Sequence, residues 1–309
     1  MQPIRLKPDD KQLQRTALAL LDSADWSGLV ALVREQPPQG AYATVQLLAN
    51  AAPVTADHRP LVAKGGALEL TLAGALLYGR AMRFRGLDTA EHISDDQWEL
   101  YLPTLAHAQE LLAEANALDP ELGLAAAWRV TAFVDATEEE KDEAELALRR
   151  ARSVPIAGLV RLITMRSEKW GGSHAAMWRV ASDYADPDNP ASLSLIAKAH
   201  FEQWLWLDTF DEAADALDKA DAYFHDGQVQ EELRQASRRV LDADTQSDPR
   251  AILFADNAFA ATFWSGGDSR HAKPHLQRMG RSIDRNLWLF NNPRLTVNRA
   301  RLSAWLLPV

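Results

Sequence analysis

The chain contains no cysteine among its 309 residues. This absence excludes disulfides, thiolate metal sites and a cysteine nucleophile, and it fits a reducing compartment. Long apolar runs are also missing, so we expect no membrane-spanning segment. Residues 1–13 hold prolines and aspartates but no apolar run. We therefore expect no secretory signal and a cytoplasmic location.

Strand signals are nearly absent as well. The sequence shows no sustained alternation of apolar and polar residues and no hairpin turn between β-branched runs. Turn residues instead divide the chain into segments of roughly 10–25 residues, which is the length of ordinary helices. The sequence therefore predicts an all-α protein of about 14 helices, joined by short turns into antiparallel hairpins. Helix should exceed roughly 60% of the residues, well above the usual mixture.

Apolar residues recur at the spacing that marks the buried face of an amphipathic helix. One stripe comprises Ala108, Leu111, Leu112, Ala115 and Leu118, and another comprises Ala213, Ala216, Leu217, Ala220 and Tyr223. Residues that favour helix N-caps follow several of the breaks, namely Thr137, Ser173, Asp211, Ser247 and Asp248.

Linkers rich in proline, glycine or serine are not found, so we expect one continuous helical-repeat domain over residues 1–309. The longest candidate loop runs from Gly86 to Asp96 and holds four acidic side chains. It marks a possible sub-boundary near residues 86–96.

Acidic residues outnumber basic ones by 43 to 33, which gives a formal net charge of −10. Residues 101–150 carry 11 acidic and 4 basic side chains, and residues 201–265 carry 14 and 5. Residues 266–309 reverse the balance, with 2 acidic and 8 basic side chains. The overall negative field argues against general nucleic-acid binding and is compatible with a basic protein partner. Acidic helix faces that keep the protein soluble are the simpler explanation.

Short segments before several expected helices share one pattern: a small or polar residue, usually an aromatic residue, two spacers, and a small or aliphatic residue. They are Ala24–Leu29, Asp208–Ala213 and Gly266–Ala272, and His107–Pro120 adds an alanine- and leucine-rich helix that ends in Asp-Pro. These segments resemble tetratricopeptide repeats, although the period of about 34 residues is not kept and Ser269 replaces the aromatic. The resemblance implies a tetratricopeptide-like α-solenoid.

The segment Lys169-Trp170-Gly171-Gly172-Ser173, followed by Met177, carries a narrower resemblance. It is similar to the Trp-Gly-Gly-Ser segment of an uncharacterised family of bacterial tetratricopeptide-like proteins. That resemblance implies a fold, a bacterial origin and a cytoplasmic location, and it implies no activity.

The same segment is the first candidate binding site. Gly171 and Gly172 permit a sharp reversal between helices, and Ser173 is suited to cap the next helix. With Trp170 as a wall and His174 beside exposed amides, the corner could bind an anion. We nevertheless expect the corner to be structural, with the anion site as the alternative. In a structural corner Trp170 should be mostly buried, Trp170→Ala should cost about 3–5 kcal/mol, and Ser173→Ala about 1 kcal/mol.

Ten tryptophans are spread along the chain, and most are expected to pack between helices. Trp204 and Trp206 cannot share one helix face, because two residues correspond to about 200° of rotation. One of them is therefore a candidate groove-lining anchor for a partner.

Three further groups contain residue types that can carry chemistry. His271 and His275 have the i, i+4 spacing of metal ligands, but Pro274 lies between them and no third ligand is evident. His200 and Glu202 could supply a general base, although both flank an apolar stripe. The acidic run from Thr137 to Glu143 suits the first turn of a helix better than a cation site. We therefore expect no metal, no cofactor and no catalytic residue that the sequence alone identifies.

The most defensible function is a helical scaffold that binds a protein or peptide, with no nucleic acid and no membrane as partner. A hydrolase acting on a small substrate is one alternative, since serine and threonine nucleophiles meet their partners only in space. An acidic neutraliser of a basic toxin is another. The sequence identifies neither the partner nor the oligomeric state.

Overall fold

The structure is a computed structural model of the whole chain, in which residues 9–86, 92–244, 248–280, 282–284, 287–288 and 293–306 are described. About 77% of these residues are helical, and none of them belongs to a strand. The prediction of an all-α protein is confirmed. No helix in this part of the chain combines the length and the apolar character needed to cross a membrane.

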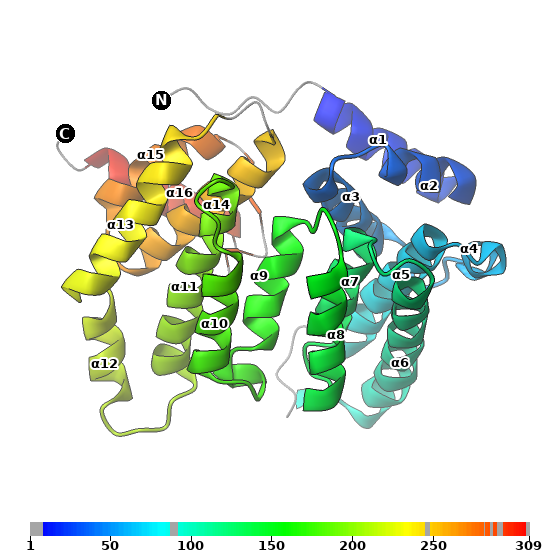
Figure 1. Cartoon of the computed structure of the whole chain (residues 1–309), viewed down its shortest axis with the longest axis horizontal. Coiled ribbons are helices and arrows are strands. Elements are labelled where there is room, and N and C mark those ends of the chain that lie inside the picture. Colours follow the sequence, from blue (N-terminus) through cyan, green and yellow to red (C-terminus); the bar gives the residue numbers. More distant parts are fainter. Residues whose placement is uncertain are drawn as a thin grey trace. The chain divides into compact units, whose positions relative to one another are not determined.

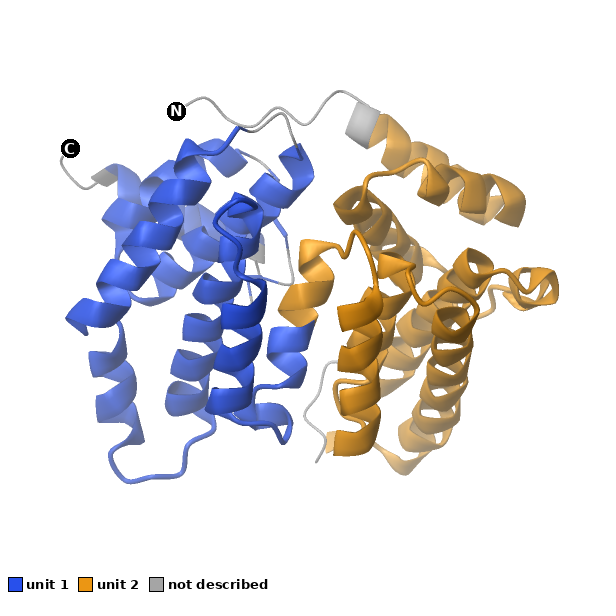
Figure 2. Cartoon of the chain, viewed as in Figure 1, with its two compact units in different colours: residues 1–6, 162–309 blue, residues 7–161 orange. Residues whose placement is uncertain are grey.

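The described residues form two compact units, shown in different colours in Figure 2. Unit 2 contains those up to residue 161, and unit 1 contains those from residue 162 onward. The division falls within α9 (Ile156–Met165). The single domain over 1–309 and the sub-boundary near residues 86–96 stay predictions, and residues 87–91 lie outside the described part of the chain.

Unit 2 is built from successive helices and the first part of α9 (Figure 1). They are α1 (Asp9–Asp22), α2 (Trp26–Arg34), α3 (Pro38–Ala51), α4 (Arg59–Lys64), α5 (Ala67–Arg85), α6 (Asp95–Leu118), α7 (Gly123–Ala132) and α8 (Glu138–Arg150). Helix α5 packs along α6, and both α3 and α7 contact α5. Sequential neighbours are therefore also neighbours in space, as short turns require.

An aromatic cluster holds α3, α5 and α7 together. The buried Trp128 ring of α7 stacks on Tyr42 of α3 at 5.3 Å between centroids, and it meets Tyr78 of α5 edge to face at 6.1 Å. The Tyr42 hydroxyl lies 3.0 Å from the Thr131 hydroxyl, so the polar end of this buried ring has a hydrogen-bond partner.

Unit 1 is built from the last part of α9 and the helices that follow it (Figure 1). They are η2 (Glu168–Trp170), α10 (His174–Tyr184), η3 (Pro190–Leu193), α11 (Ser194–Thr209), α12 (Ala216–Tyr223), α13 (Gly227–Asp242), α14 (Pro249–Ser265), α15 (Ser269–Met279) and α16 (Pro293–Leu306). Helix α14 contacts α11, α13 and α15 and is buried without interruption from Ala251 to Phe263. It is the central helix of this unit.

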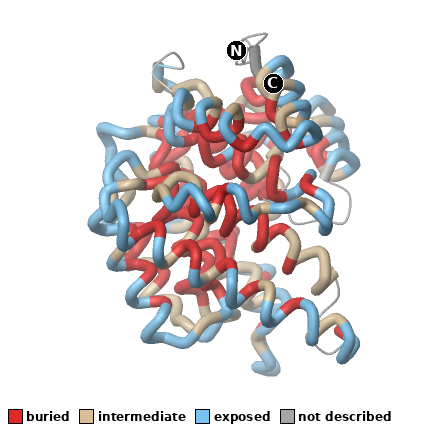
Figure 3. The backbone as a smooth tube through the Cα atoms, turned by 90° about the vertical axis from the view of Figure 1, so that its right-hand side faces the viewer, coloured by how far each residue is buried: buried red, intermediate tan, exposed pale blue. Residues whose placement is uncertain are grey.

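Most helices alternate between buried and exposed residues along their length, as Figure 3 shows. The stripe from Ala108 to Ala115 is buried as predicted, whereas Leu118 at its end is exposed. The second predicted stripe is wrong in part. Helix α12 begins at Ala216 and not before Ala213, and Leu217 is 65% exposed. The segment before Ala216 carries too few apolar side chains to be held against α11.

The predicted N-caps have mixed outcomes. Thr137 forms a capping box with Glu140, Ser173 accepts from the Ala176 amide, and Asp248 accepts from the Ala251 amide. Ser247 lies outside the described residues. Asp211 accepts from the Ala213 amide within a turn and caps no helix, because the helix starts later than its pattern indicates.

Gly79→Ala should lower the free energy of unfolding by about 1–3 kcal/mol, the usual cost of overpacking. A Cβ at Gly79 of α5 would lie 2.2 Å from the Ala49 carbonyl oxygen of α3, so two helix backbones must separate. Gly227→Ala is the matched control, since nothing lies within 4 Å of a Cβ there. Urea melts of both variants test this close approach, and equal stabilities would contradict it.

Candidate functional site

The predicted corner from Trp170 to His174 lies between η2 and α10. Gly171 adopts φ +82°, which favours glycine, while a Cβ at Gly172 would lie 2.2 Å from the Arg166 carbonyl oxygen. The Ser173 amide donates to that same carbonyl, and the Ser173 hydroxyl accepts from the Ala176 amide at 3.1 Å. The two glycines therefore have separate roles, one in backbone conformation and one in close packing, and the predicted cap is confirmed.

Trp170 does not form the buried wedge that a structural corner requires. It is 36% exposed, and no residue of η2 is buried. A loss of about 3–5 kcal/mol on truncation applies to fully buried rings, so that expectation for Trp170→Ala is too large. The Gly172 contact and the neighbouring Lys169 hold the corner instead.

An anion at this corner would meet a carboxylate that the chain already supplies. Glu168 Oε2 accepts from the His174 amide at 3.3 Å and lies 3.4 Å from the His174 ring Nε2. The position that an external anion would use at the start of α10 is thus taken by a side chain of the same corner. This arrangement favours a structural role for the amides of the corner.

Lys169 connects the corner to α11 through a buried carboxylate. Its Nζ lies 2.6 Å from Glu202 Oε2, and Lys198 Nζ lies 2.5 Å from Glu202 Oε1. Burial opposes ionisation of Glu202, but the two ammonium groups outweigh it and lower the pKa of this carboxyl to about 2. The charge is compensated twice, so Glu202 acts as a fixed ionic link and not as a proton donor.

His200, two residues before Glu202, faces a different set of partners on three helices. Its Nδ1 lies 2.8 Å from the Tyr223 hydroxyl of α12, and its Nε2 lies 3.3 Å from a carboxylate oxygen of Glu232 on α13. The ring of Trp178 on α10 meets the imidazole edge to face at 4.7 Å. Burial lowers the pKa of His200 to about 4, so the ring is neutral at pH 7. His200 and Glu202 therefore do not form one catalytic pair.

The two candidate tryptophans of α11 occupy different environments, as their spacing predicts. Trp204 packs against Phe201 and Phe224 at 5.6 Å and 5.8 Å between ring centroids. Trp206 stacks on Phe210 at 6.0 Å and meets the His174 ring at 6.4 Å. Both indoles are half-buried. Trp206 differs from Trp204 in that the ring stacked on it, Phe210, is 45% exposed.

Acidic side chains surround this exposed ring along the chain. We define the acidic aromatic surface as Trp206, Phe210 and Leu217 together with Asp208, Asp211, Glu212, Asp215, Asp218 and Asp221. Five of the six acids are exposed, and Lys219, which pairs with Asp215 at 2.8 Å, is the one basic residue in the segment 206–221. The surface lies at the end of α11, in the connection to α12 and on α12 itself.

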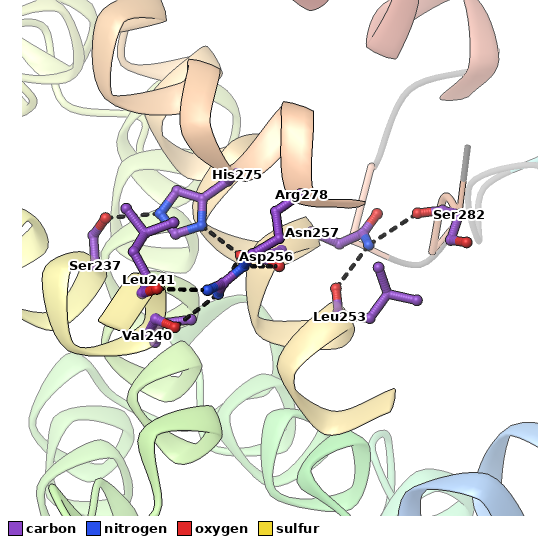
Figure 4. A network of polar contacts seen from close by, with 9 residues as sticks. All are labelled: Ser237, Val240, Leu241, Leu253, Asp256, Asn257, His275, Arg278 and Ser282. Carbon is purple, nitrogen blue, oxygen red and sulfur yellow. Dashed lines mark hydrogen bonds and ion pairs between the residues drawn. The ribbon is translucent and has the colours of Figure 1, made fainter. Parts of the chain in front are cut away.

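A second polar network, which the sequence did not predict, lies inside unit 1 (Figure 4). His275 of α15 has its Nε2 2.7 Å from the Ser237 hydroxyl of α13 and its Nδ1 2.7 Å from Asp256 Oδ1 of α14. Arg278 Nε donates to Asp256 Oδ2 at 2.7 Å, and its Nη1 and Nη2 donate to the Leu241 and Val240 carbonyls. All four charged or polar side chains are buried.

The order serine, histidine, aspartate is that of a hydrolase triad. Here, however, both carboxylate oxygens of Asp256 accept from Arg278, and the imidazole stacks on Phe259 at 5.2 Å. Burial lowers the pKa of His275, which keeps the ring neutral. The buried position of Ser237 and the second partner of Asp256 identify this network as a link between three helices.

His271 and His275, which have the i, i+4 spacing of metal ligands, engage different partners. His275 has both ring nitrogens engaged inside the unit, whereas His271 Nδ1 lies 2.7 Å from Asp268, at the start of the same helix. No group of three or more potential ligands in the described part of the chain could hold a metal ion. Comparisons with protein-family models, with curated proteins and with solved structures found no match.

Asp256→Ala should cost about 3–5 kcal/mol of unfolding free energy, because it leaves the Arg278 charge buried without its carboxylate. The double variant Asp256→Ala/Arg278→Met should lose less than the sum of the two single changes, since the uncompensated charge is gone. Denaturant melts of the three variants measure this. A cost below about 1 kcal/mol for Asp256→Ala would contradict the role of the pair.

Acid should destabilise the chain through His200. The folded-state pKa of about 4 lies below the ordinary 6.5, so between these values the unfolded chain binds more protons and stability falls as pH falls. Between pH 7 and pH 5 the loss from this one group should be about 2 kcal/mol. His200→Gln should remove that part of the pH dependence, while the contribution of His275 remains in both proteins. Urea melts at the two pH values test it, and equal losses would refute it.

Proposed function

We propose that this chain is a helical scaffold that binds a basic, apolar segment of a protein or peptide at its acidic aromatic surface. The observation that carries the proposal is the exposed Phe210 ring, stacked on Trp206 in a segment with six acids and one lysine. Aromatic anchors supply most of the affinity at interfaces, and surrounding charges select the partner and speed its approach. A basic partner with apolar side chains would contact the exposed ring and pair with the surrounding acids.

The segment from 206 to 221 also has the backbone properties of a docking surface. After Phe210, Ala213, Ala214 and Leu217 are exposed whereas Ala216 and Ala220 are buried, and the helix begins only at Ala216, although the sequence favours an earlier start. An apolar side chain such as Leu217, 65% exposed at the start of α12, is stabilised when a partner covers it.

The arrangement of the helices supports a tetratricopeptide-like scaffold, which we propose for each unit. Helix α5 packs along α6 in unit 2, and α14 packs along α15 in unit 1, where a short turn joins the two helices. Stacked hairpins of this kind present extended surfaces that bind peptides.

Two alternatives have less support. A hydrolase would need access to Ser237, which is buried next to a carboxylate already paired with Arg278. Neutralisation of a basic toxin is a special case of the proposed function, because it uses the same acidic surface for one class of basic partner.

A fluorescein-labelled amphipathic peptide of leucine and lysine should bind the full chain, and its glutamate-for-lysine counterpart should not. Phe210→Ala and the double variant Asp208→Lys/Glu212→Lys should each weaken binding about tenfold or more, since they remove the anchor or reverse the charge beside it. Fluorescence anisotropy measures the affinities.

Two controls separate this surface from general effects of charge and exposure. Glu110→Lys/Glu114→Lys makes the same change in net charge on exposed positions of α6, and Leu146→Ala removes an exposed leucine from α8. Neither should alter binding. Peptide binding that responds to the α6 variant as strongly as to Asp208→Lys/Glu212→Lys would refute a specific surface.

A further inference from the structure

The C-terminal helix α16 carries apolar side chains on two opposite faces. The buried face comprises Val297, Ala300 and Ala304, and α16 contacts α15. On the other side, Leu302 is 63% exposed and Trp305 is 73% exposed. At 100° per residue these two side chains lie within about 60° of each other and roughly opposite Ala300 and Ala304. A tryptophan so exposed in an ordered helix is typical of a residue that a partner covers.

The charge of this helix has one sign. It contains Arg294, Arg299 and Arg301 and no acidic residue. Arg301 donates to the Gly280 carbonyl, whereas Arg294 and Arg299 are exposed and flank the stripe of Leu302 and Trp305. The outer face of α16 is therefore basic and apolar, which is the chemistry that the acidic aromatic surface fits.

The two surfaces belong to the same unit but lie at different ends of it. In Figure 1, α12 and its connection to α11 lie at the lower end of unit 1, and α16 lies at the upper end near the C-terminus. One chain cannot bring its own α16 onto its own acidic aromatic surface in this structure. A second copy can supply it.

We propose that copies of this chain associate head to tail, with the outer face of α16 from one copy docked on the acidic aromatic surface of the next. In this interface Leu302 and Trp305 cover Phe210 and Leu217, and Arg294 and Arg299 approach the surrounding acids. The inference rests on the proposed function and names its partner as a second copy of the chain.

The charge pattern also decides against a symmetric dimer. Two α16 faces would bring arginines together, and two acidic aromatic surfaces would bring carboxylates together, so each surface repels its own kind. Only the unlike pair is attractive, which makes the contact heterologous and leaves one free surface at each end of the assembly.

Sedimentation velocity of the full chain tests the proposal from micromolar to submillimolar concentration. The wild type should sediment faster as its concentration rises, and added salt should reverse the effect because it screens the charges. Leu302→Ala/Trp305→Ala should weaken association about tenfold or more. Leu146→Ala, at an exposed leucine of unit 2, should leave it unchanged.

A charge exchange gives the sharpest result. Arg294→Glu/Arg299→Glu reverses the α16 face, and Asp208→Lys/Glu212→Lys reverses the acidic aromatic surface. Each variant alone should remain monomeric where the wild type associates. A mixture of the two should regain association, because the reversed faces complement each other. Circular dichroism confirms that both variants fold. A mixture that stays monomeric overturns the proposal.

Further outcomes distinguish self-association from peptide binding alone and from binding to a membrane surface. If the wild type stays monomeric while the leucine–lysine peptide still binds in a Phe210-dependent way, self-association fails and the proposed function stands. If neither occurs, both fail. A basic helix with an exposed tryptophan also suits anionic lipid. Co-sedimentation with phosphatidylserine vesicles, lost in Leu302→Ala/Trp305→Ala and accompanied by no self-association, would assign α16 to a membrane surface and overturn the proposal.

Discussion

The buried charge of Asp256 is the constraint on which the order of unit 1 depends. A carboxylate in the middle of an apolar helix is very costly unless it is paired, and the one cation of α14, Arg250, stands at the start of the helix, six residues before Asp256. Arg278 must therefore come from α15, and its remaining donors reach the last carbonyls of α13. One compensated charge thereby fixes the register of α13, α14 and α15, and His275 adds a neutral bridge between the same helices.

The neighbouring Asn257 hydrogen-bonds to residues that follow α15. Its amide nitrogen donates to the Ser282 carbonyl, and its oxygen accepts from the Asp284 amide and from the Trp288 indole. These contacts place the segment after α15 against α14, from which the chain continues to α16. The inner face of α16 is buried and the helix contacts α15, which leaves Leu302 and Trp305 on the outer face exposed.

The sequence predicted what depends on local pattern and missed what depends on distant partners. Helical periodicity and capping chemistry act within a few residues, so the all-α class, Thr137 and Ser173 were predictable. The exposure of Leu217 and Trp170 was not predictable, because sequence spacing alone does not show whether a neighbouring helix covers a side chain. The one available signal was the run of acids from Asp208 to Asp221, which leaves too little apolar surface for a helix packed on all sides.

The network of Ser237, Asp256, His275 and Arg278 shows the same limit. The i, i+4 spacing of His271 and His275 was visible, but spacing cannot say that one ring points to Asp268 and the other into the core. Asp256 and Asn257 between apolar residues were the missed signal, since a charged residue within a buried helix requires a partner from elsewhere. The different environments of Trp204 and Trp206 were predictable, because the rotation between two positions is a property of the helix alone.

The uneven charge of the chain follows from the same geometry. If acidic side chains served only solubility, they would be spread over all surfaces, and the last 44 residues would not carry 2 acids against 8 basic residues. Within unit 1, the segment 206–221 carries six acids and one lysine, whereas α16 carries arginines and no acid, so these two parts have opposite charge. Each of these two faces also exposes large apolar side chains, which is typical of surfaces that bind a partner. In the proposed head-to-tail contact, a second copy covers these exposed apolar residues, and the repulsion between like-charged faces favours the pairing of unlike ones.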